Sequence, residues 1–399
     1  MKSYRAAYSR TRPYLTTLMR HQELLTQLRH DLHCHPELSG REEKTAAHIK
    51  AFFRKHCPAD EVISKIGGYG LTFRYSYPQP GPTVMIRCEL DALPIEEPND
   101  FRYQSINEGV SHKCGHDGHM TILAALALRL RETPPARGSV ILFFQSAEET
   151  GQGAAAALQD ARFTALAPDY VFALHNIPGA PLHEVLLTPT TFSPAVQSFS
   201  VQLSGKEAHA AEPQNGRNPA VAISRIVAAL APLNVPDPNR EDFCVLTPVH
   251  LTLGQKAYGI SPGEGELHYT IRCWTNTGLD RLKARICQEI SRISTAENLR
   301  RTINWFEYFP ATVNTSRARA IVQSAAMESG KNVTERAHGF TFGEDFGWLA
   351  GRYPSVMFGL GAGEDCPALH HAEYDFPDAL IATGTSVFSE IIRRILKKN

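Results

Sequence analysis

The stretch PTVMIRCELDALP, residues 82–94, decides the fold class, because a short apolar run leads directly into acidic residues and a proline. Two further stretches repeat the apolar run with a polar end, GSVILFFQSAEET at 138–150 and DYVFALHNIPG at 169–179. A fourth apolar run is PSVMFGLGAG at 354–363. We read residues 20–56 and 120–132 as helices. Near-continuous apolar strands separated by helices predict an α/β sheet that is covered on both faces.

Polar candidates follow each predicted strand. Asp91, the pair Glu148 and Glu149, and His175 come at the ends of the first three, and a loop with His370 follows the fourth. Ligands of such sheets bind just beyond the carboxyl ends of the strands. The agreement in position is therefore stronger than any single motif.

The loop KCGHDGH, residues 113–119, adds a thiol and imidazoles to this set. Zinc-type cations take Cys, His and Asp/Glu ligands and leave a position open for water. The alternative is a polar loop that happens to contain histidine, and each other candidate has a similar structural explanation. Taken jointly, they favour a metal site with these candidate ligands: Cys114, His116, Glu149, His175 and His370.

The adjacent carboxylates Glu148 and Glu149 can take different roles, with one binding metal and the other transferring protons. Two divalent ions about 3.5–4 Å apart would share a water and polarise a carbonyl. A carboxylate beside that water would take its proton and return it to a leaving amine. This is hydrolysis chemistry, and no GxGxxG, P-loop or GxSxG motif competes with it.

Residues 190–310 follow a different pattern. The stretches at 198–205 and 265–275 alternate apolar and polar residues, and 301–309 is a third candidate strand. Between them, 218–233 and 278–293 have apolar residues at helical spacing. One-sided strands with helices on the other side predict an α+β unit of the split βαβ type. We interpret it as an inserted lid, which divides the first domain into 1–189 and 311–399.

Composition narrows the function classes. Lys+Arg and Asp+Glu both number 41, so the formal net charge is zero, which argues against a nucleic-acid partner or an acidic membrane surface. No apolar run approaches the ~20 residues that span a bilayer. The basic segment 1–22 has no apolar core, so we expect a helical, solvated extension and no secretory signal. The eight scattered cysteines without a CxxC pair indicate reduced thiols and a cytoplasmic location.

Eight motifs appear in the order LHCHPELSGREE, LDALPIEE, KCGHDGHM, FFQSAEETGQGA, FALHNIPG, GKEAHAAEP, GEDFGWL and LHHAEYDFPD. With them the chain resembles the dinuclear metal-dependent N-acyl-amino-acid amidohydrolases, which include aminoacylases, hippurate hydrolase and auxin-conjugate hydrolases. The resemblance extends over nearly the whole chain from about residue 25. It implies a metallopeptidase-type α/β catalytic domain with a mixed, helix-covered sheet, and an inserted ferredoxin-like α+β lid that forms a homodimer.

When the motifs are matched one by one, the resemblance implies that the five candidate ligands bind two divalent ions, zinc or manganese. It makes Glu148 the general base and acid, and Asp91 a residue that orients ligands. His209, in GKEAHAAEP, would polarise the scissile carbonyl, although by itself it reads as an exposed turn histidine.

The chain departs from the family pattern at several places. The usual RADMDALP is RCELDALP here, with Cys88 and Glu89, and the usual NVIP of the lid is Gly259 to Pro262. Asn176 follows His175 where an apolar residue is common, whereas Arg272 keeps the position of the strand arginine. These departures leave the ligand set intact and bear on the choice of substrate.

The resulting hypothesis is a metal-dependent hydrolase of small N-acyl amino acids. A dipeptidase of the same architecture is the first alternative. A non-catalytic, metal-containing homologue is the second, and only the altered lid motif favours it.

Overall fold

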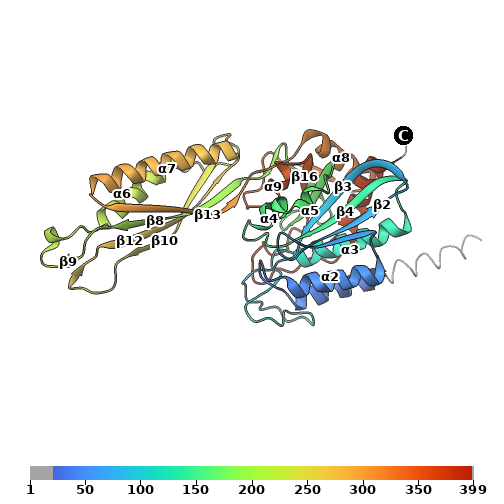
Figure 1. Cartoon of the computed structure of the whole chain (residues 1–399), viewed down its shortest axis with the longest axis horizontal. Helices are drawn as coiled ribbons and strands as arrows, with labels where there is room; N and C mark the ends of the chain where they lie inside the picture. The colour runs from blue at the N-terminus through green and yellow to red at the C-terminus, as the bar shows by residue number, and fades with distance from the viewer. Residues whose placement is uncertain (1–20, 398–399) are drawn as a thin grey trace, which may run out of the picture. The chain divides into compact units, whose positions relative to one another are not determined.

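The computed structural model describes residues 21–397 (Figure 1). The chain divides into two compact units: the first runs to Leu187 and adds Asn314–Glu335 and the chain from Leu349, and the second comprises Thr188–Val313 and Arg336–Trp348. Residues 336–348, which we assigned to the catalytic domain, thus group with the second unit. The expected basic extension at the N-terminus lies outside the described residues, except for its last two.

The first unit is built on an eight-stranded mixed sheet of order β1-β2-β4-β3-β5-β16-β6-β15. Its central strands β4, β3, β5 and β16 are parallel, while β2 and β6 run antiparallel to their central neighbours. The strands are β1 (Glu61–Ile66), β2 (Gly70–Ser76), β3 (Gln79–Glu89), β4 (Arg137–Gln145), β5 (Tyr170–Ile177), β6 (Val185–Leu187), β15 (Val333–Glu335) and β16 (Ser355–Gly361). The predicted mixed α/β fold is confirmed.

Helices cover both faces of this sheet because alternate side chains of the buried strands point to opposite sides. Val84 and Ile86 of β3 join one large core with the longer helices. Phe143 of β4 points the other way and packs on Phe163, with ring centroids 4.7 Å apart. The helices are α2 (Glu43–His56), α3 (His116–Glu132), α4 (Gly153–Gln159), α5 (Ala161–Thr164), α8 (Ser316–Glu328), α9 (Gly347–Ala350) and α10 (Ala379–Leu396).

The helix predicted across 20–56 is two helices in the structure, at 21–34 and at α2. Pro36 disfavours the helical conformation at the residue before it, and Gly40 adopts a left-handed backbone with φ +75°. The turn between the two helices carries the sequence HPELSGRE and packs against the carboxyl ends of the sheet strands, as described below.

The second unit contains the ferredoxin-like arrangement β8-α6-β10-β12-α7-β13, with an antiparallel sheet of order β10-β12-β8-β13. Helices α6 and α7 lie along one face of that sheet (Figure 1). The sequence pattern did not predict β10, because Pro248 interrupts its alternation and proline is uncommon inside strands. The elements are β7 (Thr191–Ser193), β8 (Ala195–Ser204), β9 (Ala208–His209), α6 (Ala220–Leu230), β10 (Cys244–Leu253), β11 (Ile260–Ser261), β12 (Glu264–Cys273), α7 (Asn276–Ala296), β13 (Arg300–Phe309) and β14 (Thr312–Val313).

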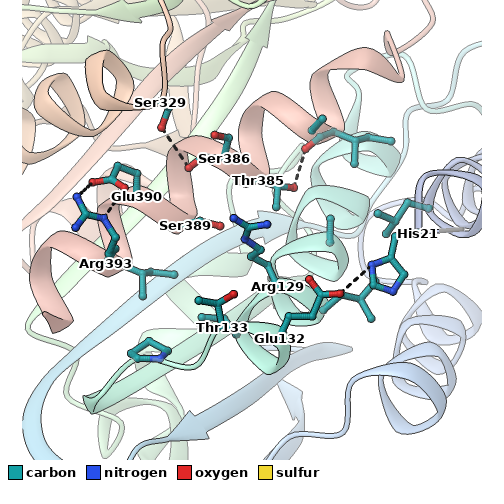
Figure 2. Close-up of a pocket in the computed structure, with 18 of the residues that line it drawn as sticks. His21, Arg129, Glu132, Thr133, Ser329, Thr385, Ser386, Ser389, Glu390 and Arg393 are labelled. Carbon is teal, nitrogen blue, oxygen red and sulfur yellow. Dashed lines mark hydrogen bonds and ion pairs between the residues drawn. The ribbon is translucent and has the colours of Figure 1, made fainter. Parts of the chain in front are cut away.

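A cavity of about 860 Å³ lies in the first unit between the helix at 21–34, α3 and α10. Figure 2 shows Arg129, Thr385 and Ser389 around it, and the ion pair between His21 and Glu132 at one wall. Its lining includes none of the five candidate ligands, so this cavity is separate from the candidate site. No helix within residues 21–397 combines the length and apolar character needed to cross a bilayer.

Candidate metal centre

The carboxyl ends of the parallel strands bring the predicted residues together. Asp91 lies just after β3, Glu148 and Glu149 lie in the turn after β4, and His370 lies in the loop after β16. His175 is inside β5 rather than beyond it, two residues before the strand ends. Because β4, β3, β5 and β16 are neighbours and parallel, these ends meet at one edge of the sheet.

Two groups of donor atoms share the thiol of Cys114. In one, Cys114 joins His116 and His175, and in the other it joins Glu149 and His370, with the atoms of each group within 4.8 Å of one another. The Cys114 sulfur lies 3.5 Å from Nε2 of His175, and Nε2 of His370 lies 3.7 Å from a Glu149 oxygen. All five predicted ligands therefore converge, in an arrangement suited to two neighbouring cations.

The surroundings of His116 indicate whether a cation fits between the candidate ligands. Its Nδ1 lies 2.8 Å from the backbone oxygen of Asp91, which orients the ring. Its Nε2 is buried and has no hydrogen-bond partner within residues 21–397. Burial lowers the pKa of His116, but Asp91, Glu89 and Glu149 outweigh it and raise that pKa to about 10. The surrounding negative charge thus favours a cation, and a sulfur, nitrogen and carboxylate donor set suits zinc or manganese.

His175 is held in the form that binds metals. Its Nδ1 donates to the backbone oxygen of Asn176 at 2.9 Å, which leaves Nε2 facing Cys114. Burial, reinforced by His119, lowers the pKa of His175 to about 3. The ring is therefore neutral at physiological pH, as a histidine ligand must be.

Asp91 connects the loops that carry the ligands. One of its oxygens accepts from the Glu149 amide at 2.9 Å and from the Ser39 hydroxyl at 2.7 Å. Burial opposes its ionisation, yet the hydrogen bond with His116 is among the contacts that lower the pKa of Asp91. Asp91 thus stays charged and holds both His116 and the turn after β4.

Glu148 lies beside the two groups of donors. Its side chain is nearly buried, and one oxygen lies 3.9 Å from Nε2 of His116. The residue before it, Ala147, has a left-handed backbone with φ +53°. A carboxylate beside two groups of candidate metal ligands is a candidate for proton transfer.

His370 is the most exposed of the five candidates, with a side chain 51% exposed. Its amide donates to the backbone oxygen of Lys113 at 2.9 Å, so the loop after β16 is tied to the loop of Cys114. Its backbone is left-handed, with φ +64°, which is unusual for a residue other than glycine.

His209 belongs to the second unit, where β9 pairs with β11. The side chain is exposed, and Nδ1 accepts from the Ala211 amide at 3.0 Å. In the neutral ring the proton is therefore on Nε2, which makes that atom a hydrogen-bond donor. The predicted role of His209 in catalysis stays a prediction.

A second set of residues behind the ligands was not predicted. Nδ1 of His119 lies 2.7 Å from Glu89, and its Nε2 lies 2.6 Å from the side-chain oxygen of Asn176, whose amide donates to Tyr374. Glu89 and Asn176, which are both departures from the family pattern, thus contact the same imidazole, that of His119. Gly115 allows this packing, because a Cβ there would lie 2.7 Å from Asn176. The spacing of His116 and His119 on one helix face was the available signal.

His33 anchors the loop that carries Cys114 and His116. It is fully buried, and its two ring nitrogens lie 2.7 Å from Asp117 and 3.0 Å from Glu97. Burial opposes protonation, but these two carboxylates raise the pKa of His33 to about 9. Lys113 also pairs with Glu97, and Arg29 lies 3.6 Å from Asp117. This buried ionic cluster fixes the residues on both sides of Cys114 and His116.

Comparison with known proteins agrees with this geometry. The model of peptidase family M20/M25/M40 matches residues 85–394. The chain belongs to this family. Membership confirms the predicted class of enzyme, a hydrolase of amide bonds, and the family that the motifs indicated.

Individual relatives are similar over almost their whole length. The N-acetyl-L-cysteine deacetylase of Bacillus subtilis is 30% identical over 382 residues, which are 95% of this chain and 89% of that protein. An uncharacterized hydrolase of Staphylococcus aureus is 27% identical over 94% of this chain and 98% of its own. A solved structure of a dinuclear metal-binding M20 peptidase from Bacillus subtilis shares the fold, with a TM-score of 0.81, 22% identity, and 95% and 99% of the two chains covered.

Proposed function

We propose that this M20 hydrolase removes the acyl group from small N-acyl amino acids by metal-dependent hydrolysis of the amide. The observation that carries the proposal is the pair of donor groups sharing Cys114, with the Glu148 carboxylate beside them. The similarity to a deacetylase of an N-acetylated amino acid supports this substrate class. The solved relative from Bacillus subtilis is a dinuclear metal-binding peptidase, which supports two cations here, and zinc and manganese both suit the donors.

The cations would be held by Cys114, His116, Glu149, His175 and His370. Bound there, they would supply Lewis acidity and lower the pKa of a neighbouring water to roughly 7. The protein contributes orientation, since Asp91 fixes His116 and the Glu149 amide, and Asn176 fixes His175. Preorganised ligands of this kind do not have to be ordered again in each catalytic cycle.

Glu148 is the proposed proton carrier. It would take a proton from the attacking water and later donate it to the nitrogen of the leaving amino acid. Its near burial reduces competition from bulk water for that proton. His209 would donate a hydrogen bond from Nε2 to the carbonyl oxygen as negative charge develops there. This assignment is supported by the GKEAHAAEP motif and by the protonation that the Ala211 contact favours.

The direct test combines metal analysis of the purified protein with a panel of N-acetyl and N-benzoyl amino acids and unblocked dipeptides. Glu148→Gln should lower kcat by at least about 100-fold and leave bound metal unchanged, because the amide cannot carry the proton. Turnover by this variant close to that of the wild-type protein would reject the role of Glu148.

The same panel separates the two alternatives. Preference for unblocked dipeptides would identify an exopeptidase of this architecture. Bound metal without hydrolysis of any compound would indicate a non-catalytic homologue. The intact set of ligand candidates and Glu148 speaks against the second alternative, because loss of catalysis commonly begins at such residues.

We also propose a homodimer formed through the second unit. Within the described chain β10 is an edge strand of its sheet, and Val249, Leu251 and Leu253 on it are 60%, 47% and 41% exposed. An open apolar edge of this kind is a template for pairing with another strand. A second copy of the same strand would satisfy both its backbone groups and its apolar side chains.

A further inference from the structure

The turn between the first two helices, residues 35–42, lies against the turn that carries the proposed catalytic carboxylates. From its contacts we infer that Glu42 is a positioning residue, which holds the backbone before Glu148 in the conformation that directs Glu148 and Glu149. The inference rests on the proposed function for the roles of these two residues, whereas the contacts themselves belong to the structure alone.

Glu42 is fully buried, and both of its carboxylate oxygens are used. One oxygen accepts from the Ala147 amide at 2.8 Å and from the Gly40 amide at 2.8 Å. The other accepts from the Ser146 hydroxyl at 2.6 Å. Glu42 stands at the N-terminus of α2, but within the described chain its side chain makes no capping bond to that helix. The buried carboxylate therefore serves the turn after β4 and not its own helix.

The residue that Glu42 holds has a backbone conformation that alanine disfavours. Ala147 has φ +53°, in the left-handed region where the Cβ crowds the following carbonyl oxygen. Such a conformation persists when the surrounding contacts over-determine it, and it is common next to functional residues. Here the two residues that follow are Glu148 and Glu149, so the strained residue sets the direction in which both carboxylates leave the strand.

Glu148 is held on its other side as well. After Glu148, the Glu149 amide donates to Asp91, whereas the bond from the Gly153 amide to the Ala147 oxygen, at 3.0 Å, lies before Glu148. Ser39, three residues before Glu42, donates to the same oxygen of Asp91 at 2.7 Å. The turn at 35–42 thus reaches the backbone before Glu148 directly, through Glu42, and the backbone after it through Ser39 and Asp91. This accounts for the motif LHCHPELSGREE, which carries no reacting group.

The test compares Glu42→Ala with the matched variant Glu37→Ala. Glu37 lies in the same turn and accepts from the amide and hydroxyl of Thr45, both at 2.8 Å, which are contacts with α2 only. We expect Glu42→Ala to lower kcat by about 10- to 100-fold with KM changed by less than about threefold, as for other residues that orient ligands. Glu37→Ala should lower the melting temperature without this loss of kcat.

Hydrogen exchange provides a readout that does not depend on activity. In Glu42→Ala the amides of residues 146–150 should exchange at least about tenfold faster, because the Ala147 amide loses its acceptor and the turn opens. In Glu37→Ala they should exchange at the wild-type rate. Unchanged exchange in Glu42→Ala would overturn the inference, whatever the activity of the protein.

A double variant separates positioning from a general loss of stability. Glycine adopts the left-handed backbone without strain. Glu42→Ala combined with Ala147→Gly should therefore regain about two- to fivefold in kcat over Glu42→Ala alone. No recovery, together with equal losses in Glu42→Ala and Glu37→Ala, would show that the residue acts only on stability. If the wild-type protein hydrolyses nothing on the panel, the proposed function fails, and the exchange experiment still decides this inference.

Discussion

The carboxyl edge of the first sheet and the ferredoxin-like sheet of the second unit use buried residues in opposite ways. In the second unit, β12 alternates buried and less buried residues along its length, and its core is almost entirely apolar. In the first unit, all eight residues of β5 are buried, and the edge of the sheet collects buried ionisable groups from five separate segments. The second sheet is stabilised by its pattern of burial, whereas the first must pair every charge that it buries.

The difference shows where this chain accepts a cost in stability for function. A buried charge is costly unless it is paired and hydrogen-bonded. The first unit meets this requirement with defined partners, such as Asp117 and Glu97 on His33 and Arg87 on Glu89. At His116 the Nε2 atom has carboxylate oxygens of Glu148 and Glu149 at 3.9 Å but no hydrogen-bond partner within the described chain, and this is where the ligand candidates converge.

The largest contrast between the two regions should come from their cysteines. Cys114→Ala removes the thiol shared by both donor groups, so we expect kcat to fall by about 10³-fold and bound metal to decrease. Cys273→Ala changes a cysteine that is 3% exposed in the core of the second unit. It should lower the free energy of unfolding by about 1–2 kcal/mol and leave metal content unchanged. Activity assays, metal analysis and urea unfolding measure these effects, and equal metal content in both variants would contradict the assignment of Cys114.

The buried pairing should also make the stability of the first unit depend on pH. Because folding raises the pKa of His33 from 6.5 to about 9, its contribution is complete below about pH 6.5 and is lost as pH rises through 9. The cost of His33→Gln in urea unfolding should therefore be largest near pH 6, at no more than about 3 kcal/mol. It should shrink by about 1.4 kcal/mol per pH unit above pH 6.5.

A matched change in the second unit is His268→Gln. This side chain is 29% exposed and lies 3.1 Å from Glu266 at the surface. Its effect on the free energy of unfolding at pH 6 should stay within about 0.5 kcal/mol. A cost for His33→Gln that is the same at pH 6 and pH 9.5 would show that His33 is not held as a cation.

The smallest effect on stability is expected at Gly259, where the lid motif departs from the family pattern. No described atom lies within 4 Å of a Cβ built at this position, so Gly259→Asn should change the free energy of unfolding by less than about 0.5 kcal/mol. An asparagine there adds hydrogen-bonding groups, and KM for at least one N-acyl amino acid should fall by about two- to fivefold with kcat unchanged. If KM stays the same across the whole panel, this departure has no part in substrate choice.

Periodicity and strand-end position in the sequence predicted much of this protein. Four apolar strands predicted the α/β class, and alternating strands predicted the α+β unit of the split βαβ type. Polar residues at strand ends, together with the loop at 113–119, gave the ligand candidates. These features are local in the chain, since side chains alternate along a strand and repeat along a helix. The prediction failed where tertiary contacts decide, as at β10, whose alternation Pro248 interrupts and whose apolar second half is exposed, and at the turn that divides residues 20–56.

The sequence by itself determined which residue types are available and roughly where each strand ends. Only the tertiary structure decided which of them meet: that Cys114 joins both donor groups, that Glu89 and Asn176 share His119, and that Glu42 holds Ala147 from 105 residues away. Such pairings depend on the order of strands in the sheet and on the packing of a turn against it. No local pattern encodes them, because the free energy that selects them comes from burying and pairing groups far apart in the chain.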